Sequence, residues 1–348
     1  MKKSSSVILV LSTILFSCQN INLIDDNSQK INTQNVNSLN NYTIDIWNKH
    51  LLNVELDGGQ LQEGCKPYYK LAKGSVKGSV ILFHGYSSCP QQYDDISQLL
   101  VNKGYNVFVP LLPGHGQKPN INENKVKDNS LRLPDLNSIG IYDEFAKSMG
   151  SMLKNEKGTK IVAGLSVGGA IAAKSMITNQ DVFDRGLLMA PFFNAASLSG
   201  SIFLPLFGNF IPEKEISWGN GCENQRKAGR AGYCDFKLGN VAAARKFGLS
   251  TLKDVDKINK PIQIIGVEKD PAASNKDIAV AVEKIKNSKA CFFPKGTNHS
   301  MFSPQDNLGV NMFWLSSLKS QIVNYIDTGK NFDIIGESEH NLGLCRYN

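Results

Sequence analysis

The stretch KIVAGLSVGGAIAA, residues 160–173, decides the fold of this chain. An apolar run leads to Ser166, which has Gly164 two residues before it and Gly168 two residues after it. This order is typical of a buried strand that turns sharply into a helix and lifts the serine hydroxyl above the sheet in strained backbone geometry. Because the start of a helix carries a partial positive charge, it stabilises an anion beside this serine. We therefore predict that Ser166 is a nucleophile.

The surrounding sequence decides between a catalytic turn and an ordinary glycine-rich turn that packs a helix against a strand. The motif lies between a predicted strand over residues 159–165 and a predicted helix over residues 167–178. Further strands are predicted over residues 80–84, 106–110, 186–190, 261–266 and 289–294, and further helices over residues 92–102, 276–287 and 305–326. Strand, helix and strand at this spacing predict an α/β fold with a doubly wound, mostly parallel sheet.

Length and composition agree with one large domain. The 348 residues, 41% of them hydrophobic, can bury a sizeable core. The net charge of +7 is spread along the chain without a block of Lys or Arg, so we expect no nucleic-acid partner. Besides Cys18, the even number of remaining cysteines predicts disulfides, with Cys222 and Cys234 as the local pair and Cys345 as a candidate partner of Cys291.

The first 18 residues predict export. A basic start precedes an apolar core that is too short to span a membrane. The end of this segment, Leu-Phe-Ser-Cys, resembles the lipobox of bacterial lipoproteins, which implies that Cys18 is lipidated, and ordinary signal cleavage is the alternative. We expect a lipid-anchored protein of the cell envelope, at the outer membrane or cell surface. Residues 19–45, rich in Asn, Gln and Ser, predict a flexible tether, and residues 328–348 form a tail without a clear pattern.

Four separated motifs carry a resemblance to a known superfamily. They are ILFHGY (residues 81–86), PLLPGHG (residues 110–116), AGLSVGG (residues 163–169) and GTNH (residues 296–299). In this order they resemble the α/β-hydrolase superfamily, and within it the small carboxylesterases and monoacylglycerol lipases, over roughly residues 76–327. The resemblance implies an α/β-hydrolase fold with a cap inserted between strands 6 and 7, and a reaction that needs no metal and no organic cofactor.

The resemblance also implies an oxyanion hole. In this fold the loop after the first parallel strand lies beside the nucleophile, and Gly85 permits its turn. The backbone N–H of Tyr86 would then point into the pocket opposite that of Val167. We expect His84 to support this loop from beneath and His115 to support the pocket, with neither taking part in the chemistry.

The order of nucleophile, acid and histidine in the superfamily identifies the remaining catalytic residues. Asp270 lies in the loop at the carboxyl end of a predicted buried strand, with Glu268 as a near alternative and Asp277 as a distant one. His299 lies downstream of the acid and next to the carboxyl end of a strand. We expect His299 to take the proton from Ser166 while Asp270 orients its imidazole.

Residues 192–258 show no sheet pattern and predict a cap, because long insertions in compact domains often form lids. An apolar run in the cap either packs into the core or lines an acyl pocket. It supplies Phe203 and Phe207, which together with Tyr86 are the expected substrate contacts. Residues 219–234 are glycine-rich and polar, and they predict an exposed loop held by its own disulfide.

The expected function is that of a serine hydrolase, with its domain over residues 46–327. It cleaves carboxylic esters of short to medium acyl chains, monoacylglycerols or lysophospholipids through an acyl-enzyme. The same residues would serve an amidase, a peptidase, a thioesterase or an envelope acyltransferase, and a non-catalytic binding lipoprotein is a further alternative. The partners are a small-molecule ester or lipid substrate and, through the lipid anchor, a membrane; the oligomeric state stays open.

Overall fold

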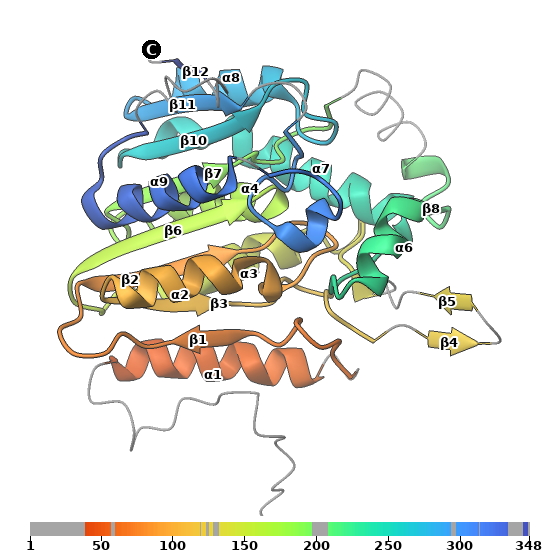
Figure 1. Ribbon diagram of the computed structural model, residues 1–348, viewed down its shortest axis with the longest axis horizontal. Helices are drawn as coiled ribbons and strands as arrows, with labels where there is room; N and C mark the ends of the chain where they lie inside the picture. Colours follow the sequence, from red (N-terminus) through yellow and green to blue (C-terminus); the bar gives the residue numbers. More distant parts are fainter. Residues whose placement is uncertain are drawn as a thin grey trace, which may run out of the picture.

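Eight strands of the described residues form the main sheet. The computed structural model describes residues 39–56, 60–118, 120–122, 125–127, 132–196, 208–293, 297–312, 314–332 and 344–346. The strands of the sheet are, along the chain, β1 (Tyr68–Lys70), β2 (Gly78–Phe83), β3 (Tyr105–Val109), β6 (Thr159–Leu165), β7 (Arg185–Met189), β10 (Ile262–Val267), β11 (Ser288–Phe293) and β12 (Leu344–Arg346). Their order in space is β1-β3-β2-β6-β7-β10-β11-β12 (Figure 1). All neighbours from β3 to β11 are parallel, and β1 and β12 are antiparallel, so the predicted mostly parallel sheet is confirmed.

Helices cover both faces of the sheet (Figure 1). The helices are α1 (Asn41–Leu56), α2 (Asp94–Asn102), α3 (Gly140–Ser151), α4 (Val167–Thr178), α6 (Asn220–Lys227), α7 (Leu238–Lys253), α8 (Asn275–Lys284) and α9 (Leu315–Thr328). In β2, Ile81 and Phe83 belong to the core under α1, α3, α4, α7 and α8, whereas Val80 and Leu82 belong to the core under α2 and α9. Alternate residues of a strand face opposite sides, so a strand that is covered on both sides is apolar throughout.

The folded domain begins earlier in the chain than expected. Helix α1 starts at Asn41, inside the segment predicted as a tether (residues 19–45). The indole of Trp47 is fully buried, and its ring lies 6.0 Å from that of Tyr69 in β1 and 5.6 Å from that of Phe108 in β3. The helix therefore belongs to the core that covers one face of the sheet.

Truncating Trp47 tests this role of α1. A Trp47→Ala substitution leaves a cavity between the helix and the sheet, so we expect the free energy of unfolding to fall by about 3 to 5 kcal/mol. Leu56→Ala in the same helix is the control, because Leu56 is 72% exposed, and it should change stability by less than about 0.5 kcal/mol. Urea unfolding of both variants measures the difference, and equal midpoints would show that α1 does not stabilise the domain.

The cap follows β7 and precedes β10, which are the fifth and sixth strands of this sheet along the chain rather than the sixth and seventh. It contains α6, α7 and a two-stranded antiparallel sheet of β8 (Glu215–Ser217) and β9 (Asp235–Lys237), which was not expected from the sequence. The segment predicted as an exposed loop (residues 219–234) is helix α6 followed by a buried stretch that begins at Arg230. Tertiary contacts, rather than helix propensity, hold these glycine-rich residues in place.

The chain after His299 also differs from the prediction. Pro304 begins a short 3-10 helix, Pro304–Asn307, and α9 starts only at Leu315, ten residues later than the predicted start at residue 305. Within the described ranges, no helix is long and apolar enough to cross a membrane. The described part of the chain also contains a short hairpin of β4 (Asn120–Asn122) and β5 (Lys125–Lys127) and the 3-10 helices Pro90–Tyr93 and Val255–Lys257.

Disulfides join residues both within the cap and between separate segments of the chain. Cys222 and Cys234 are bonded as predicted, and a second bond joins Cys65 to Cys89. Cys291 in β11 is also in a disulfide, and the antiparallel pairing with β12 places Cys345 directly opposite it, in agreement with the expected partner. The tail, for which no pattern was visible, thus contributes a strand to the sheet.

Candidate active site

Ser166 sits at the turn from β6 into α4. Its backbone has φ 58° and ψ −122°, a conformation that L-residues rarely adopt. A Cβ atom at Gly164 would lie 2.0 Å from the carbonyl oxygen of Gly168, and one at Gly168 would lie 2.2 Å from that of Phe83. Only glycine fits at either position. The turn therefore has the strained geometry predicted for a nucleophile.

The loop after β2 lies beside this serine. Phe83, at the end of β2, is paired in parallel with Gly164 in β6, so the two strands end side by side. A Cβ atom at Gly85 would lie 3.6 Å from the Cβ of Ser166. Strand β2 has β3 on one side and β6 on the other, so the connections after β2 and after β3 lead to opposite sides of β2. In α/β sheets, ligands bind at the carboxyl ends of the strands where the strand order reverses in this way. Tyr86 and Val167, the two predicted amide donors, both line the cavity above this point.

Two buried histidines support the loop. The Nε2 atom of His84 accepts a hydrogen bond from the N–H of Leu112 (3.0 Å), and Nε2 of His115 accepts one from the N–H of Ser87 (3.1 Å). Each Nδ1–H therefore donates to a carbonyl oxygen, that of Gly85 (2.9 Å) for His84 and that of Pro113 (3.0 Å) for His115. Both rings are neutral and held by backbone groups, as a supporting role requires.

Burial lowers the pKa of three histidines. It lowers the pKa of His50 and of His115 to about 4, and it lowers the pKa of His84 well below its ordinary value of 6.5. In the unfolded chain these groups protonate near pH 6.5, whereas in the folded protein they stay neutral. Their contribution to stability is therefore fully present above pH 6.5 and is lost as the pH falls toward 4.

We expect the free energy of unfolding to decrease between pH 6.5 and 4.5, by up to about 1.4 kcal/mol per pH unit for each such histidine. Denaturant unfolding at a series of pH values measures the slope. His50 accepts a hydrogen bond from the N–H of Leu111 (3.3 Å), so His50→Gln keeps an acceptor and removes one titrating group. The slope should become shallower in this variant, and an unchanged slope would contradict the assignment.

The acid and the histidine meet across neighbouring strands. Asp270 follows β10, His299 follows β11, and the carboxylate Oδ2 of Asp270 lies 2.8 Å from Nδ1 of His299. The other oxygen, Oδ1, accepts hydrogen bonds from the N–H groups of Ala272 (2.7 Å) and Ala273 (2.9 Å). The Asp270 side chain is fully buried, so these donors and the histidine fix its orientation.

The two alternative acids lie elsewhere. Asp277 belongs to α8 and accepts a hydrogen bond from Asn194 (3.2 Å). Glu268 precedes the turn that carries Asp270, and it does not line the cavity described below. The Nε2 atom of His299 is buried and makes no hydrogen bond to the described part of the chain, which leaves it available to the cavity.

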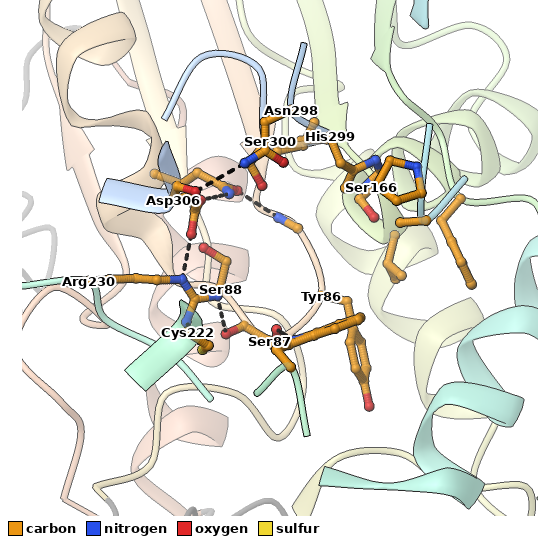
Figure 2. Close-up of a pocket in the computed structure, with 18 of the residues that line it drawn as sticks. Tyr86, Ser87, Ser88, Ser166, Cys222, Arg230, Asn298, His299, Ser300 and Asp306 are labelled. Carbon is orange, nitrogen blue, oxygen red and sulfur yellow. Dashed lines mark hydrogen bonds and ion pairs between the residues drawn. The ribbon is translucent and has the colours of Figure 1, made fainter. Parts of the chain in front are cut away.

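Ser166, His299 and the loop after β2 line a cavity of about 380 Å³. Ser166 and His299 lie at one end, and Arg230 and Asp306 lie toward the other (Figure 2). The apolar part of the wall includes Leu165, Val167, Phe192, Trp218, Val241 and Ala244. Of the predicted substrate contacts, Tyr86 lines the cavity, and Phe203 and Phe207 lie outside the described residues, as does Cys18. Among the described residues, no group of His, Cys, Asp and Glu could hold a metal ion.

The polar end of the cavity was not foreseen from the sequence. Arg230 donates through Nε to Oδ1 of Asp306 (2.5 Å), and Gln92 donates through Nε2 to Oδ2 of the same carboxylate (2.8 Å). The Oε1 atom of Gln92 accepts a hydrogen bond from the N–H of Gly85 (2.9 Å). Arg230 and Asp306 are 76 positions apart in the chain, and neither belongs to a recognisable motif.

Comparisons with known proteins agree with this architecture. The sheet order, the cap and the serine turn define the α/β-hydrolase superfamily. The chain belongs to the family Hydrolase_4, described as serine aminopeptidase S33, whose family model matches residues 74–306. A sequence comparison with curated proteins finds no match.

Solved structures share the fold. The monoacylglycerol lipase of Paleococcus ferrophilus is 16% identical with a TM-score of 0.56, over 76% of this chain and 99% of that one. A soluble variant of monoglyceride lipase from Saccharomyces cerevisiae, in complex with a substrate analog, is 16% identical with a TM-score of 0.55, over 75% and 90%. One of the metagenome-derived lipolytic enzymes LipS and LipT is 14% identical with a TM-score of 0.57, over 77% and 99%. At such identities the likeness is one of fold alone.

Proposed function

We propose that the protein hydrolyses carboxylic esters through an acyl-enzyme, with Ser166 as nucleophile, His299 as general base and Asp270 as the acid that orients it. The observation that carries the proposal is the cavity itself. It is lined by a serine in strained geometry and by a histidine whose far nitrogen is bound to a buried carboxylate and whose near nitrogen is unoccupied. A histidine oriented by a carboxylate, with its other ring nitrogen free in the same cavity as the serine, is part of what nucleophilic catalysis by serine requires.

In the first half of the reaction, Nε2 of His299 takes the proton of the Ser166 hydroxyl as its oxygen attacks the ester carbonyl. The N–H groups of Tyr86 and Val167 bind the negative oxygen of the tetrahedral intermediate, and one such donor typically contributes ~2.7 to 4 kcal/mol of transition-state stabilisation. The histidine then gives its proton to the leaving alcohol. In the second half, a water loses a proton to His299 and attacks the acyl-serine. The histidine then returns this proton to the Ser166 oxygen as the bond to the acyl group breaks and the acid leaves.

The wall of the cavity supports an ester in preference to a peptide N-terminus, to which the family description refers. An ammonium group needs an unpaired carboxylate near the serine. Among the described residues that line the cavity, Asp306 is the one carboxylate, and it is already bound by Arg230 and Gln92. The apolar wall accepts an acyl chain, and the volume lies at the lower end of ligand cavities, which favours short to medium chains.

A fluorophosphonate probe and p-nitrophenyl esters of graded acyl length test the proposal. The wild-type protein should be labelled at Ser166 and should turn over the shorter esters. In Ser166→Ala labelling should be lost, and kcat should fall by about 10⁶-fold, since the members of such a triad act as a unit. Asp270→Asn should reduce kcat by about 10⁴-fold, whereas Asp277→Asn, outside the cavity, should leave it unchanged.

Thioester and amide substrates and an added alcohol acceptor complete the panel. Faster turnover of an amide or a thioester would assign a different leaving group, and transfer of the acyl group to the alcohol would indicate an acyltransferase. A wild-type protein that neither labels nor turns over any of these substrates would contradict catalysis and favour a binding role.

We further propose that the protein is exported and anchored by a lipid on Cys18. The disulfides Cys65–Cys89 and Cys222–Cys234, and the further one that contains Cys291, support an oxidising compartment. Cells grown with a labelled fatty acid should incorporate it into the wild-type protein and not into Cys18→Ser. Incorporation into both proteins, or into neither, would contradict lipidation at Cys18, and an unlabelled protein shortened at its N-terminus would indicate ordinary signal cleavage.

A further inference from the structure

We propose that Arg230, a residue of the cap, is a positioning residue. It holds two loops in their places relative to each other: the oxyanion loop after β2 (residues 84–89) and the histidine loop that leads from His299 to Asp306. This inference rests on the proposed ester hydrolysis. Arg230 follows α6 and is only 8% exposed, as is the side chain of Asp306 with which it pairs. Its guanidinium contacts both loops that supply the catalytic groups, so the cap completes the site as well as covering it.

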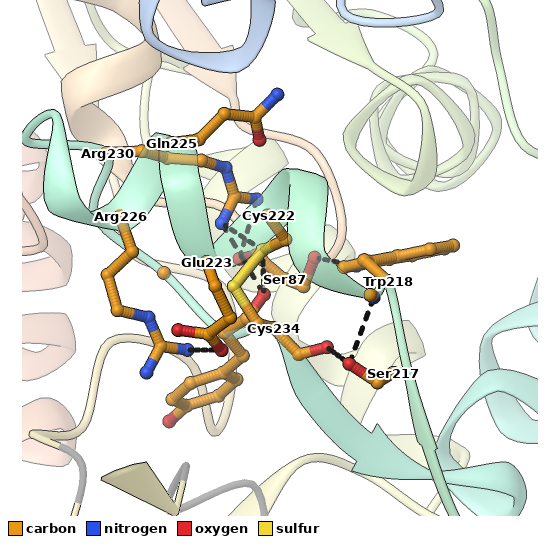
Figure 3. The surroundings of a disulfide bond; sticks show 12 residues. Ser87, Ser217, Trp218, Cys222, Glu223, Gln225, Arg226, Arg230 and Cys234 are labelled. Carbon is orange, nitrogen blue, oxygen red and sulfur yellow. Dashed lines mark hydrogen bonds and ion pairs between the residues drawn. A yellow bond between two sulfur atoms is a disulfide. The ribbon is translucent and has the colours of Figure 1, made fainter.

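The first loop is held at Ser87, the residue after the proposed oxyanion donor Tyr86. Ser87 has a positive φ of 57°, which an L-residue adopts only where its surroundings enforce it. Its carbonyl oxygen accepts hydrogen bonds from the N–H of Tyr233 (2.8 Å) and from Nη2 of Arg230 (3.4 Å). Its hydroxyl accepts one from Nε1 of Trp218 (2.8 Å) (Figure 3). Three residues of the cap thus bind one residue of the oxyanion loop.

The backbone of the cap approaches Ser87 closely. A Cβ atom at Gly232 would lie 2.2 Å from the carbonyl oxygen of Ser87, so a glycine is required for the close approach. The Cys222–Cys234 disulfide lies directly behind the arginine, with Nη1 of Arg230 3.4 Å from the Sγ of Cys222 (Figure 3). The cap segment is therefore closed into a loop on one side and docked on Ser87 on the other.

The second loop is held at Asp306, seven residues after His299. Besides its ion pair with Arg230, Asp306 accepts hydrogen bonds at its backbone carbonyl from Nε2 of Gln225 in α6 (2.7 Å) and from Nδ2 of Asn298 (3.3 Å). Asn298 is the neighbour of the proposed general base. Movement of Asp306 would therefore be transmitted to the imidazole of His299.

A need for stability alone does not account for a charge pair in this place. Two buried charges lose their hydration, and well-packed apolar residues of similar volume often stabilise a protein as much or more. The guanidinium group instead fixes the orientation of its partners. Its N–H donors lie in one plane in a fixed arrangement, so it binds several acceptors at once, which a lysine ammonium cannot do. Here the acceptors are the carboxylate of Asp306 and the carbonyl of Ser87.

The test compares Arg230→Met and Arg230→Lys in the full mature chain, with p-nitrophenyl butyrate as substrate and thermal unfolding as the measure of folding. The matched control is Arg226→Met. Arg226 lies in α6, four residues before Arg230, and it pairs with Glu223 of that helix (3.7 Å), away from the cavity lining. We expect Arg230→Met to lower kcat by about 10- to 100-fold with little change in KM, because displaced groups weaken the transition state more than the bound substrate.

The variant Arg230→Lys distinguishes an effect of Arg230 on the position of the catalytic groups from an effect on the stability of the fold. Lysine keeps a charge for Asp306, so the melting temperature should stay close to that of the wild type, while kcat stays reduced because the contact with Ser87 is lost. If Arg230→Met does not fold, the neutral double variant Arg230→Met with Asp306→Asn replaces it, since it leaves no unpaired buried charge. This variant should fold and remain slow.

Two results would overturn the proposal. One is a folded Arg230→Lys with the kcat of the wild type, and the other is an Arg230→Met or a double variant that is as active as Arg226→Met. Either would leave the proposed hydrolysis intact, because the wild type would still turn over the ester and be labelled at Ser166. A wild type without turnover or labelling would contradict both the hydrolysis and the role of Arg230.

Discussion

The close contact between the start of helix α4 and the end of strand β2 is the constraint on which the site depends. At Gly168 the helix backbone lies so near the carbonyl of Phe83 that no side chain fits between them. This contact limits the separation of the two amides that would bind the oxyanion, one in the loop after β2 and one at the start of α4. The parallel pairing of β7, β10 and β11 places the loops after β10 and β11 at the same edge of the sheet as the serine. The close backbone contact and the register of the sheet together place the groups that follow four strands.

The oxyanion loop is tied to two parts of the chain that lie outside the sheet. On one side the Cys65–Cys89 disulfide joins it to the segment before β1, and on the other side Tyr233 of the cap binds its Ser87. The few residues of a loop cannot by themselves hold an N–H group in one position, because a free loop has many conformations. Contacts from distant segments reduce that freedom before substrate binds. The insertion and the N-terminal region thus have a part in the site that the sheet alone could not provide.

The parts of the structure that could be predicted are those fixed by local sequence. The strand and helix around Ser166 have the bounds expected for them, because glycine spacing and apolar runs act within a few residues. Helix α1 was missed since its buried residues Ile44, Trp47 and Leu51 are sparse among polar neighbours. The pairing of Arg230 with Asp306 could not be foreseen, because it depends on how the cap folds back over the sheet. Long-range contacts of this kind leave no periodic signal in the chain.

The short strands β1 and β12 have a consequence for how the protein behaves among its own copies. Each pairs antiparallel with the last parallel strand on its side, β3 or β11, and each is only three residues long. A sheet edge offers unpaired N–H and C=O groups to other chains, and a long, flat edge is a template for aggregation. Here both long outer strands are partly covered, and the strands that take their place are too short to recruit a neighbour over many residues. The architecture that assembles the site also protects it from association through the sheet.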